Sequence, residues 1–244
     1  MTFTTTCQNC PLRLLPLFSP MPADEVEFMQ DFKTGEVTVP RGGTVLTQGE
    51  RSPRLFTVLS GLGTRSVLLE DGRRQVINFV FPGDFLGLQA GLMGEMRHTV
   101  TASTPMVLCS FSRSRLWELF SREPERAYDL TWIAAIQEHF LGETVATLGQ
   151  RDATERMAWA LVRIWRRLSA LGLQHEGRVP MPFRQHDLAD ALGLSLVHTN
   201  RVVTALRRAG LARLGRGSLE LGDHAALSAI AGLPMETEER RPIL

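Results

Sequence analysis

The fold is decided by the stretch RQHDLADALGLSLVHTNRVVTALRRAGL, residues 184–211, whose spacing predicts two helices joined by a tight turn. In the first helix, Leu188 and Leu192 share one face, and Ala189 is small where a second helix must approach closely. Gly193 supplies the conformational freedom that the turn needs. This order of alanine, glycine and apolar residues is typical of a helix-turn-helix.

The second helix of this stretch has one apolar side and one mixed side. Ser195 is a good N-cap for it, and Gly210 marks its end. Val202, Val203 and Leu206 point back toward the core, with the spacing of one helix face. By exclusion, the outward positions are Leu196, Val197, Asn200, Arg201 and Thr204.

The outward residues suit the major groove of DNA. Arginine can donate two hydrogen bonds to guanine, asparagine can pair in the same way with adenine, and valine or leucine can pack against a thymine methyl group. The alternative for Leu196 and Val197 is contact with a neighbouring element of the same chain. Downstream, the segment ARLGRGSLEL (212–221) predicts a tight hairpin, or wing, that brings Arg213 and Arg216 near phosphates.

The distribution of charge also indicates an anionic partner. The chain has 244 residues and a net charge of +1, yet residues 151–217 alone carry +7, while residues 1–150 carry −3. Such a basic segment favours nucleic acid as the partner; the alternative is a solvated basic surface. Both interpretations apply to Arg207 and Arg208. The predicted DNA-contacting residues are Ser195, Leu196, Val197, Asn200, Arg201, Thr204, Arg207, Arg208, Arg213 and Arg216.

Residues 35–112 predict a small all-β domain. Their short runs are rich in Val, Thr, Phe and Leu, and turn-forming residues separate these runs at intervals of about 8–12 residues. Within LEDGRRQ (69–75), the Asp-Gly pair between two such runs is a strong signal for a hairpin. The regular spacing favours a sandwich or a barrel-like roll.

A long helix over residues 124–149 follows, without an internal proline and with a broad apolar face. A small β domain cannot cover so long a face, whereas a second copy of the same helix can, so we expect a dimer interface here. The alternative is burial of this face within the monomer. The predicted interface residues are Leu130, Ile133, Ile136, Phe140, Leu141, Val145 and Leu148. A further helix begins after Asp152, which we expect to be its N-cap.

These elements predict an α+β protein with an N-terminal β-roll (jelly-roll-like) domain, a long dimerisation helix and a C-terminal winged helix-turn-helix. The predicted parts are an N-terminal segment with a C-x-x-C motif (1–34), the β-roll (35–122), the long helix (123–150), the winged helix-turn-helix (151–233) and a mobile tail (234–244). No apolar run approaches the roughly 20 residues of a membrane span, so we expect a cytoplasmic protein without a membrane partner. No catalytic constellation is visible, and an enzyme is not expected.

This order of domains resembles the CRP/FNR family of bacterial transcription regulators over almost the whole chain. The resemblance rests on GTVLTQGE (43–50), LEDGRRQVINFVFPGDFLG (69–87) and the helix-turn-helix. It implies a homodimer that binds a palindromic site in double-stranded DNA and works with RNA polymerase. It also implies that Arg201 reads guanine. Val197 stands where family members often carry a glutamate, so the family's usual half-site does not carry over.

The resemblance also bears on cofactors. The cyclic-AMP branch of the family holds its nucleotide with a Gly-Glu pair and an Arg-Ser pair. Leu88 and His98 stand here in place of that glutamate and that serine, so binding of cyclic AMP is not expected.

The oxygen-sensing branch of the family binds an iron–sulfur cluster through three N-terminal cysteines and one distant cysteine. This chain has Cys7, Cys10 and a distant Cys109, with Pro16 at the third N-terminal position. A cluster with an additional ligand and a zinc ion are two alternatives. The interpretation that we favour is that Cys109 is an ordinary strand residue and that the N-terminal pair is a remnant in a segment that is mobile without metal.

The sequence therefore predicts a homodimeric, sequence-specific DNA-binding transcription regulator whose β-roll domain senses an unidentified signal. Two alternatives come from other classes. One is a signalling module that binds a small ligand and contacts protein rather than DNA. The other is an oxygen sensor that binds metal through the three cysteines.

Overall fold

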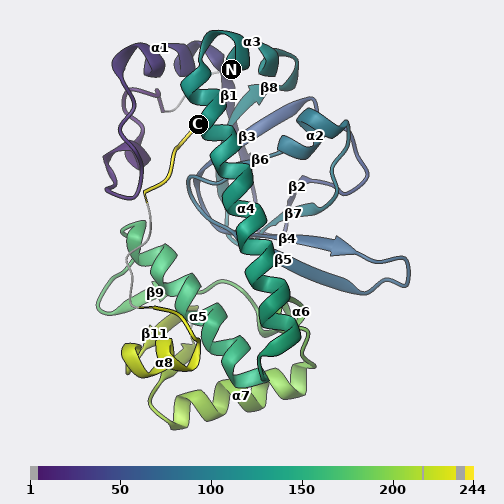
Figure 1. The fold of residues 1–244 in the computed structure, drawn as a ribbon, viewed down its shortest axis with the longest axis vertical. Coiled ribbons are helices and arrows are strands. Elements are labelled where there is room, and N and C mark those ends of the chain that lie inside the picture. Colours follow the sequence, from purple (N-terminus) through teal and green to yellow (C-terminus); the bar gives the residue numbers. More distant parts are fainter. Residues whose placement is uncertain (1–4, 216, 235–239) are drawn as a thin grey trace. The chain divides into compact units, whose positions relative to one another are not determined.

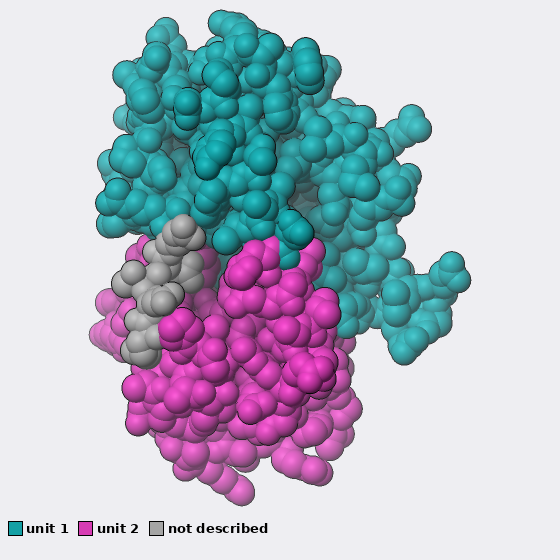
Figure 2. Space-filling model, in the orientation of Figure 1, with its two compact units in different colours: residues 1–138, 240–244 teal, residues 139–239 magenta. Residues whose placement is uncertain are grey.

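The chain forms two units, which the computed structural model describes over residues 5–215, 217–234 and 240–244. Unit 1 contains residues 1–138 and 240–244, and unit 2 contains residues 139–239 (Figure 2). Helix α4 (Pro124–Gln150) belongs to both, since the division falls at residue 138. In the described part of the chain, no helix is long and apolar enough to cross a membrane.

Unit 1 contains a roll of two four-stranded antiparallel sheets, with strand orders β1-β8-β3-β6 and β2-β7-β4-β5 (Figure 1). The first sheet consists of β1 (Lys33–Val39), β8 (Met106–Ser112), β3 (Arg54–Ser60) and β6 (Phe85–Leu86). The second consists of β2 (Thr44–Leu46), β7 (Thr99–Ala102), β4 (Gly63–Leu68) and β5 (Arg74–Val80). The predicted hairpin at Asp71–Gly72 joins β4 and β5. The sequence prediction of a β-roll is therefore confirmed.

Strand β3 shows how the alternation of side chains builds two cores in unit 1. Phe56 and Val58 belong to the core between the two sheets. Leu55, on the opposite face of the strand, belongs to a second core that the sheet forms with the helices. These helices are α1 (Ala23–Phe32), α3 (Leu116–Arg122) and the first half of α4. The remaining helical segments of unit 1 are η1 (Pro11–Leu14), α2 (Leu88–Met93) and η2 (Arg113–Arg115).

The second core corrects part of the predicted dimer interface. Leu130 and Ile133 are buried in it against Phe28, Leu119 and other residues of the same unit. They cover apolar surface of their own chain, so their side chains are not exposed for a partner in this structure. The apolar face that the sequence predicts is thus covered by the same chain in its first half and exposed further along the helix. Periodicity alone does not reveal this difference.

A buried histidine lies inside unit 1, and it makes the stability of the roll sensitive to pH. His98 is 6% exposed, and burial, together with the nearby positive charge of Arg65, lowers the pKa of its imidazole to about 4. The unfolded chain binds this proton below pH ~6.5, while the folded chain does so only near pH 4. The stability that the neutral His98 contributes is therefore fully present above pH ~6.5, and it is lost as the pH falls toward 4.

We expect the free energy of unfolding to decrease between pH 6.5 and 4, with His98 contributing up to about 3 kcal/mol. Urea denaturation at several pH values in this window, on the wild type and on His98→Gln, measures the contribution. The variant should have a shallower dependence on pH. Identical slopes for the two proteins would show that His98 does not cause the loss.

Unit 2 contains the predicted winged helix-turn-helix. Helix α5 (Ala153–Ala170) begins at Asp152, whose carboxylate accepts hydrogen bonds from the backbone of Thr154 and Glu155, at 2.7 and 2.9 Å. The predicted N-cap is therefore confirmed. The two helices of the motif are α6 (Gln185–Leu192) and α7 (Leu196–Arg208). The wing is a three-stranded sheet of order β10-β11-β9, formed by β10 (Ala212–Gly215), β11 (Ser218–Leu221) and β9 (Arg178–Pro180), and α8 (His224–Ile230) follows it.

The end of the sequence differs from the predicted mobile tail over residues 234–244. Residues 235–239 lie outside the described part, but residues 240–244 return to unit 1 (Figure 1). The backbone of Arg241 pairs with Leu17 and Ser19, and the side chains of Ile243 and Leu244 are buried. The segment lacks periodicity, which led to the prediction. Two consecutive large apolar side chains are nevertheless enough to dock it.

Candidate nucleic-acid interface

Helix α7 is fixed to unit 2 by one face. Gly193 ends α6 in the left-handed conformation (φ +63°), and this reverses the chain within a short turn. Ser195 then begins α7, since its side-chain oxygen accepts a hydrogen bond from the backbone of His198 at 3.2 Å. The inward face of the helix consists of Thr199, Val202, Val203 and Leu206, all buried. His198, in the first turn of the helix, is exposed.

The opposite face of α7 carries the predicted base-reading residues into solvent. Val197 is 70% exposed, and Asn200 and Arg201 are also exposed. None of these three side chains has a hydrogen bond or an ion pair with another described residue. Leu196 and Thr204 are half-buried. The exposed valine, asparagine and arginine together match the apolar group and the hydrogen-bonding groups that contacts to base edges require.

Basic residues frame this helix. Arg207 and Arg208 lie in its last turn, where both are exposed and neither has an ion-pair partner in the described part of the chain. Arg213 lies on β10 of the wing and is also exposed. The other predicted wing residue, Arg216, lies outside the described residues. Exposed arginines beside a recognition surface are suited to phosphate contacts.

One residue of the wing was missed by the sequence analysis. Arg178 on β9 approaches Glu220 on β11 at 3.3 Å, and Arg213 lies 3.8 Å from the same carboxylate. Glu220 on the central strand β11 thus lies close to two arginines, one on each of the flanking strands β9 and β10. The pairing of β9 with β11 joins residues about 40 positions apart, and no local pattern in the sequence indicates it.

Helix α4 presents the rest of the predicted dimer interface in two ways. Leu141 and Val145 are exposed, at 45% and 71%, so this part of the apolar face is open. Phe140 is half-buried because its ring stacks on that of Trp159, at 5.8 Å between centroids. Ile136 and Leu148 are half-buried as well. The surface that is left for a partner is thus narrower than the sequence suggests, and it lies toward the C-terminal half of the helix.

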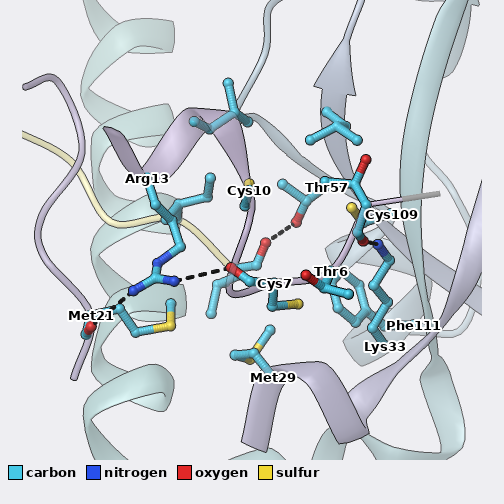
Figure 3. A pocket seen from close by; sticks show the side chains of 15 residues that line it. Thr6, Cys7, Cys10, Arg13, Met21, Met29, Lys33, Thr57, Cys109 and Phe111 are labelled. Carbon is cyan, nitrogen blue, oxygen red and sulfur yellow. Dashed lines mark hydrogen bonds between the residues drawn. The ribbon is translucent and has the colours of Figure 1, made fainter. Parts of the chain in front are cut away.

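The three cysteines line one pocket in unit 1, which we call the thiol pocket (Figure 3). The cavity has a volume of about 40 Å³, room for a few water molecules at most. Cys109 lies on β8, as predicted. Cys7 is not in a mobile segment: its backbone N–H donates to the Gln30 side chain at 2.7 Å, and its carbonyl accepts from Arg13 at 3.0 Å. Thr57, Ile243 and Leu244 line the same pocket.

The thiol pocket does not fit the iron–sulfur cluster of the oxygen-sensing branch. Burial raises the pKa of the Cys109 thiol to about 11 and also raises that of Cys7, so both groups are protonated at pH 7 while no metal is bound. The described residues contain no group of three His, Cys, Asp or Glu side chains arranged to hold a metal ion. Pro16 supplies no ligand at the third N-terminal position.

Both domains match models of known families. Residues 36–123 match the cyclic nucleotide-binding domain, and residues 155–230 match the Crp-like helix-turn-helix domain. The second match includes α6, α7 and the wing strands β10 and β11.

Individual proteins resemble the chain over nearly its full length. The transcriptional activator protein FnrL of Cereibacter sphaeroides is 30% identical over 236 residues, which cover 95% of this chain and 94% of that protein. The nitrogen fixation regulation protein FixK of Bradyrhizobium diazoefficiens is 29% identical over 225 residues, or 92% and 93%. The solved structure of FixK2 from Bradyrhizobium japonicum has a TM-score of 0.72 at 26% identity and covers 80% of this chain. With both domains present in the family's order, the chain belongs to the CRP/FNR family of DNA-binding transcription regulators.

Proposed function

We propose that this regulator acts as a homodimer that inserts helix α7 of each copy into successive major grooves of a palindromic site. The observation that carries the proposal is the division of α7 into a buried face and an exposed face. The exposed face presents Val197, Asn200 and Arg201, which have no partner among the described residues. Side chains held this way need no rearrangement within the protein before they meet a base edge.

Each outward side chain has a distinct proposed role. Arg201 donates two hydrogen bonds to guanine, and Asn200 pairs with adenine. Val197 contacts a thymine methyl group, and Leu196 with Thr204 lines the edge of the same surface. Ser195 lies at the start of the helix, where the backbone approaches phosphate. The phosphate contacts of the set are Arg207, Arg208, Arg213 and Arg216.

Dimerisation follows from the exposed apolar residues of α4. A two-fold axis beside Leu141 and Val145 pairs two copies of this helix, and it places the two α7 helices on half-sites one helical turn apart, near 34–36 Å. The half-sites of the palindrome then mirror the symmetry of the protein. Chromosomal DNA and RNA polymerase are the partners of this dimer, which works in the cytoplasm. FnrL carries the name of an activator, and we assign activation to this chain as well.

The β-roll senses a signal other than cyclic AMP. Arg97 occupies the place of the phosphate-binding arginine, but its guanidinium lies at the surface and pairs with Glu95 at 2.8 Å. The adjacent His98 is buried, and its lowered pKa leaves it neutral at pH 7. A neutral imidazole and an arginine that is already ion-paired with a glutamate form a poor site for a cyclic phosphate.

Genome-wide mapping of bound sites, followed by gel retardation on the recovered fragments, tests the proposed function. We expect a palindromic consensus and retardation of these fragments, but not of shuffled sequences of equal length. If the chain enriches no DNA and instead co-purifies with a protein through residues 139–239, it is a signalling module and the proposal fails.

Dependence on an oxygen-labile cluster is not expected, because the described residues of the thiol pocket include no group of side chains arranged to hold a metal ion. Protein purified without oxygen should contain little iron or sulfide and should bind its site equally before and after exposure to air. The variant Cys7→Ser/Cys10→Ser should bind as the wild type does, and Cys109→Val should be only mildly destabilising. A brown protein with near-stoichiometric iron that loses DNA affinity in air would contradict this expectation.

A further inference from the structure

Residues 240–244, which we call the strap, are held on unit 1 by backbone and side-chain contacts. The N–H of Arg241 donates to the carbonyl of Leu17 at 3.0 Å, and the carbonyl of Arg241 accepts from the N–H of Ser19 at 2.9 Å. Phe18 and Arg241 form a parallel β-bridge between these bonds. The guanidinium of Arg241 also lies 3.9 Å from a carboxylate oxygen of Asp84. The strap therefore binds as a short strand does at an open edge.

The end of the strap enters the helical core of unit 1. Ile243 and Leu244 are 5% and 8% exposed, and Leu244 joins the cluster that contains Phe28 and Phe111. The hydroxyl of Thr57 donates a hydrogen bond to the carbonyl of Leu244 (Figure 3). Thr57 is itself buried, so the strap satisfies a polar group that would otherwise lack this partner.

The strap forms part of the wall of the pocket that the thiols line. Ile243 and Leu244 are wall residues of the thiol pocket together with Cys7 and Cys109. Cys109 lies directly opposite Thr57 in the pairing of β8 with β3, so the anchoring hydroxyl is one strand away from the thiol. Cys109 is half-buried with the strap docked, and Ile243 and Leu244 form part of the wall beside it.

The strap, which lines this pocket, follows directly after unit 2 in the chain. Unit 2 comprises residues 139–239, so the chain enters it through α4 and leaves it just before the strap. While the strap is docked, the chain attaches unit 2 to unit 1 at both of its ends. When the strap is released, one of the two attachments is lost.

We propose that the strap is a built-in peptide ligand of unit 1, which narrows the thiol pocket when docked and widens it for thiol-directed ligands when released. Release also changes the affinity of unit 2 for DNA, a second step that rests on the proposed function. The ligand class that competes with the strap is a small electrophile to which a cysteine sulfur adds, with the thiol proton passing to solvent.

Labelling of the full chain with iodoacetamide at pH 8, read by peptide mass spectrometry, tests the docking. The test variant is Ile243→Asp/Leu244→Asp, and the matched control is Arg240→Ala, because residue 240 is exposed and belongs to the same segment. We expect Cys109 to react about tenfold faster or more in the double variant, and unchanged in the control. Equal rates in the wild type and the double variant would overturn the proposal.

A second variant guards against unfolding as the cause. Thr57→Val keeps the volume of the side chain but removes its donor to Leu244, and we expect a smaller acceleration at Cys109, with a thermal midpoint close to that of the wild type. No acceleration in Thr57→Val would contradict an anchoring role of this hydroxyl.

The effect of strap release on DNA affinity is measured in a separate experiment. In the double Asp variant, affinity for the mapped site should fall by about fivefold or more, a typical size for coupled sites. Unchanged affinity alongside accelerated labelling would overturn the coupling while the docking stands. If neither the wild type nor the double Asp variant binds DNA, the proposed function fails, and the labelling result is unaffected.

Discussion

Arg201→Ala is expected to weaken binding to the specific site by about 1–3 kcal/mol and to abolish the preference for one base in each half-site. The physical reason is that an arginine fork donates two hydrogen bonds to one guanine, and no other base offers both acceptors at that geometry. Arg201 is exposed and without a partner in the described structure, so its removal should leave the fold intact. Competition binding on a set of sites that differ at single positions measures both effects.

Arg208→Ala is the matched control, because Arg208 lies on the same helix, is equally exposed and is also unpaired among the described residues. A phosphate contact carries no base information, so this variant should weaken all sequences alike. The slope of log affinity against log salt concentration should decrease by roughly one unit. Arg216→Ala is expected to behave in the same way. If Arg201→Ala also weakens specific and random DNA equally, Arg201 does not read a base.

The helix-turn-helix could be predicted from sequence because its determinants are local. The turn at Gly193, the cap at Ser195 and the inward spacing of Val202 and Leu206 all lie within about 20 residues of one another. Each is a single-residue effect on backbone geometry or on one helix face. The same holds for the N-cap at Asp152, whose partner Glu155 is three residues away.

The thiol pocket and the strap could not be predicted, because they depend on residues far apart in the sequence. Cys7, Cys109 and Leu244 meet only after the sheet of unit 1 and its covering helices have formed. The strap is too short to show any periodicity, so its composition resembles that of a disordered tail. Periodicity also reports that a helix face is apolar without identifying what covers it. For this reason Leu130 and Val145 received the same interpretation although they have different neighbours.

The exposed half of the α4 face supports the prediction with the largest effect. Leu141 and Val145 lie one turn apart on the same side of the helix and are both open to solvent. In a dimer that pairs this face with its own copy, the variant Leu141→Glu/Val145→Glu buries four carboxylates near one axis. Burial of unpaired charges is strongly unfavourable, so we expect monomers. A monomer engages one half-site at a time, and affinity for the full palindrome should fall by about 100-fold or more.

Light scattering and binding to the palindrome, measured on the same samples, test this prediction. Ala146→Glu is the matched control, since Ala146 is exposed on the same helix but is rotated away from the Leu141–Val145 side. It should remain a dimer and bind normally, which separates the position of the charge from its mere addition. Affinity for an isolated half-site should be the same in the double variant and the wild type, because α7 is unaltered. A dimer that persists with both glutamates present would place the interface elsewhere on the chain.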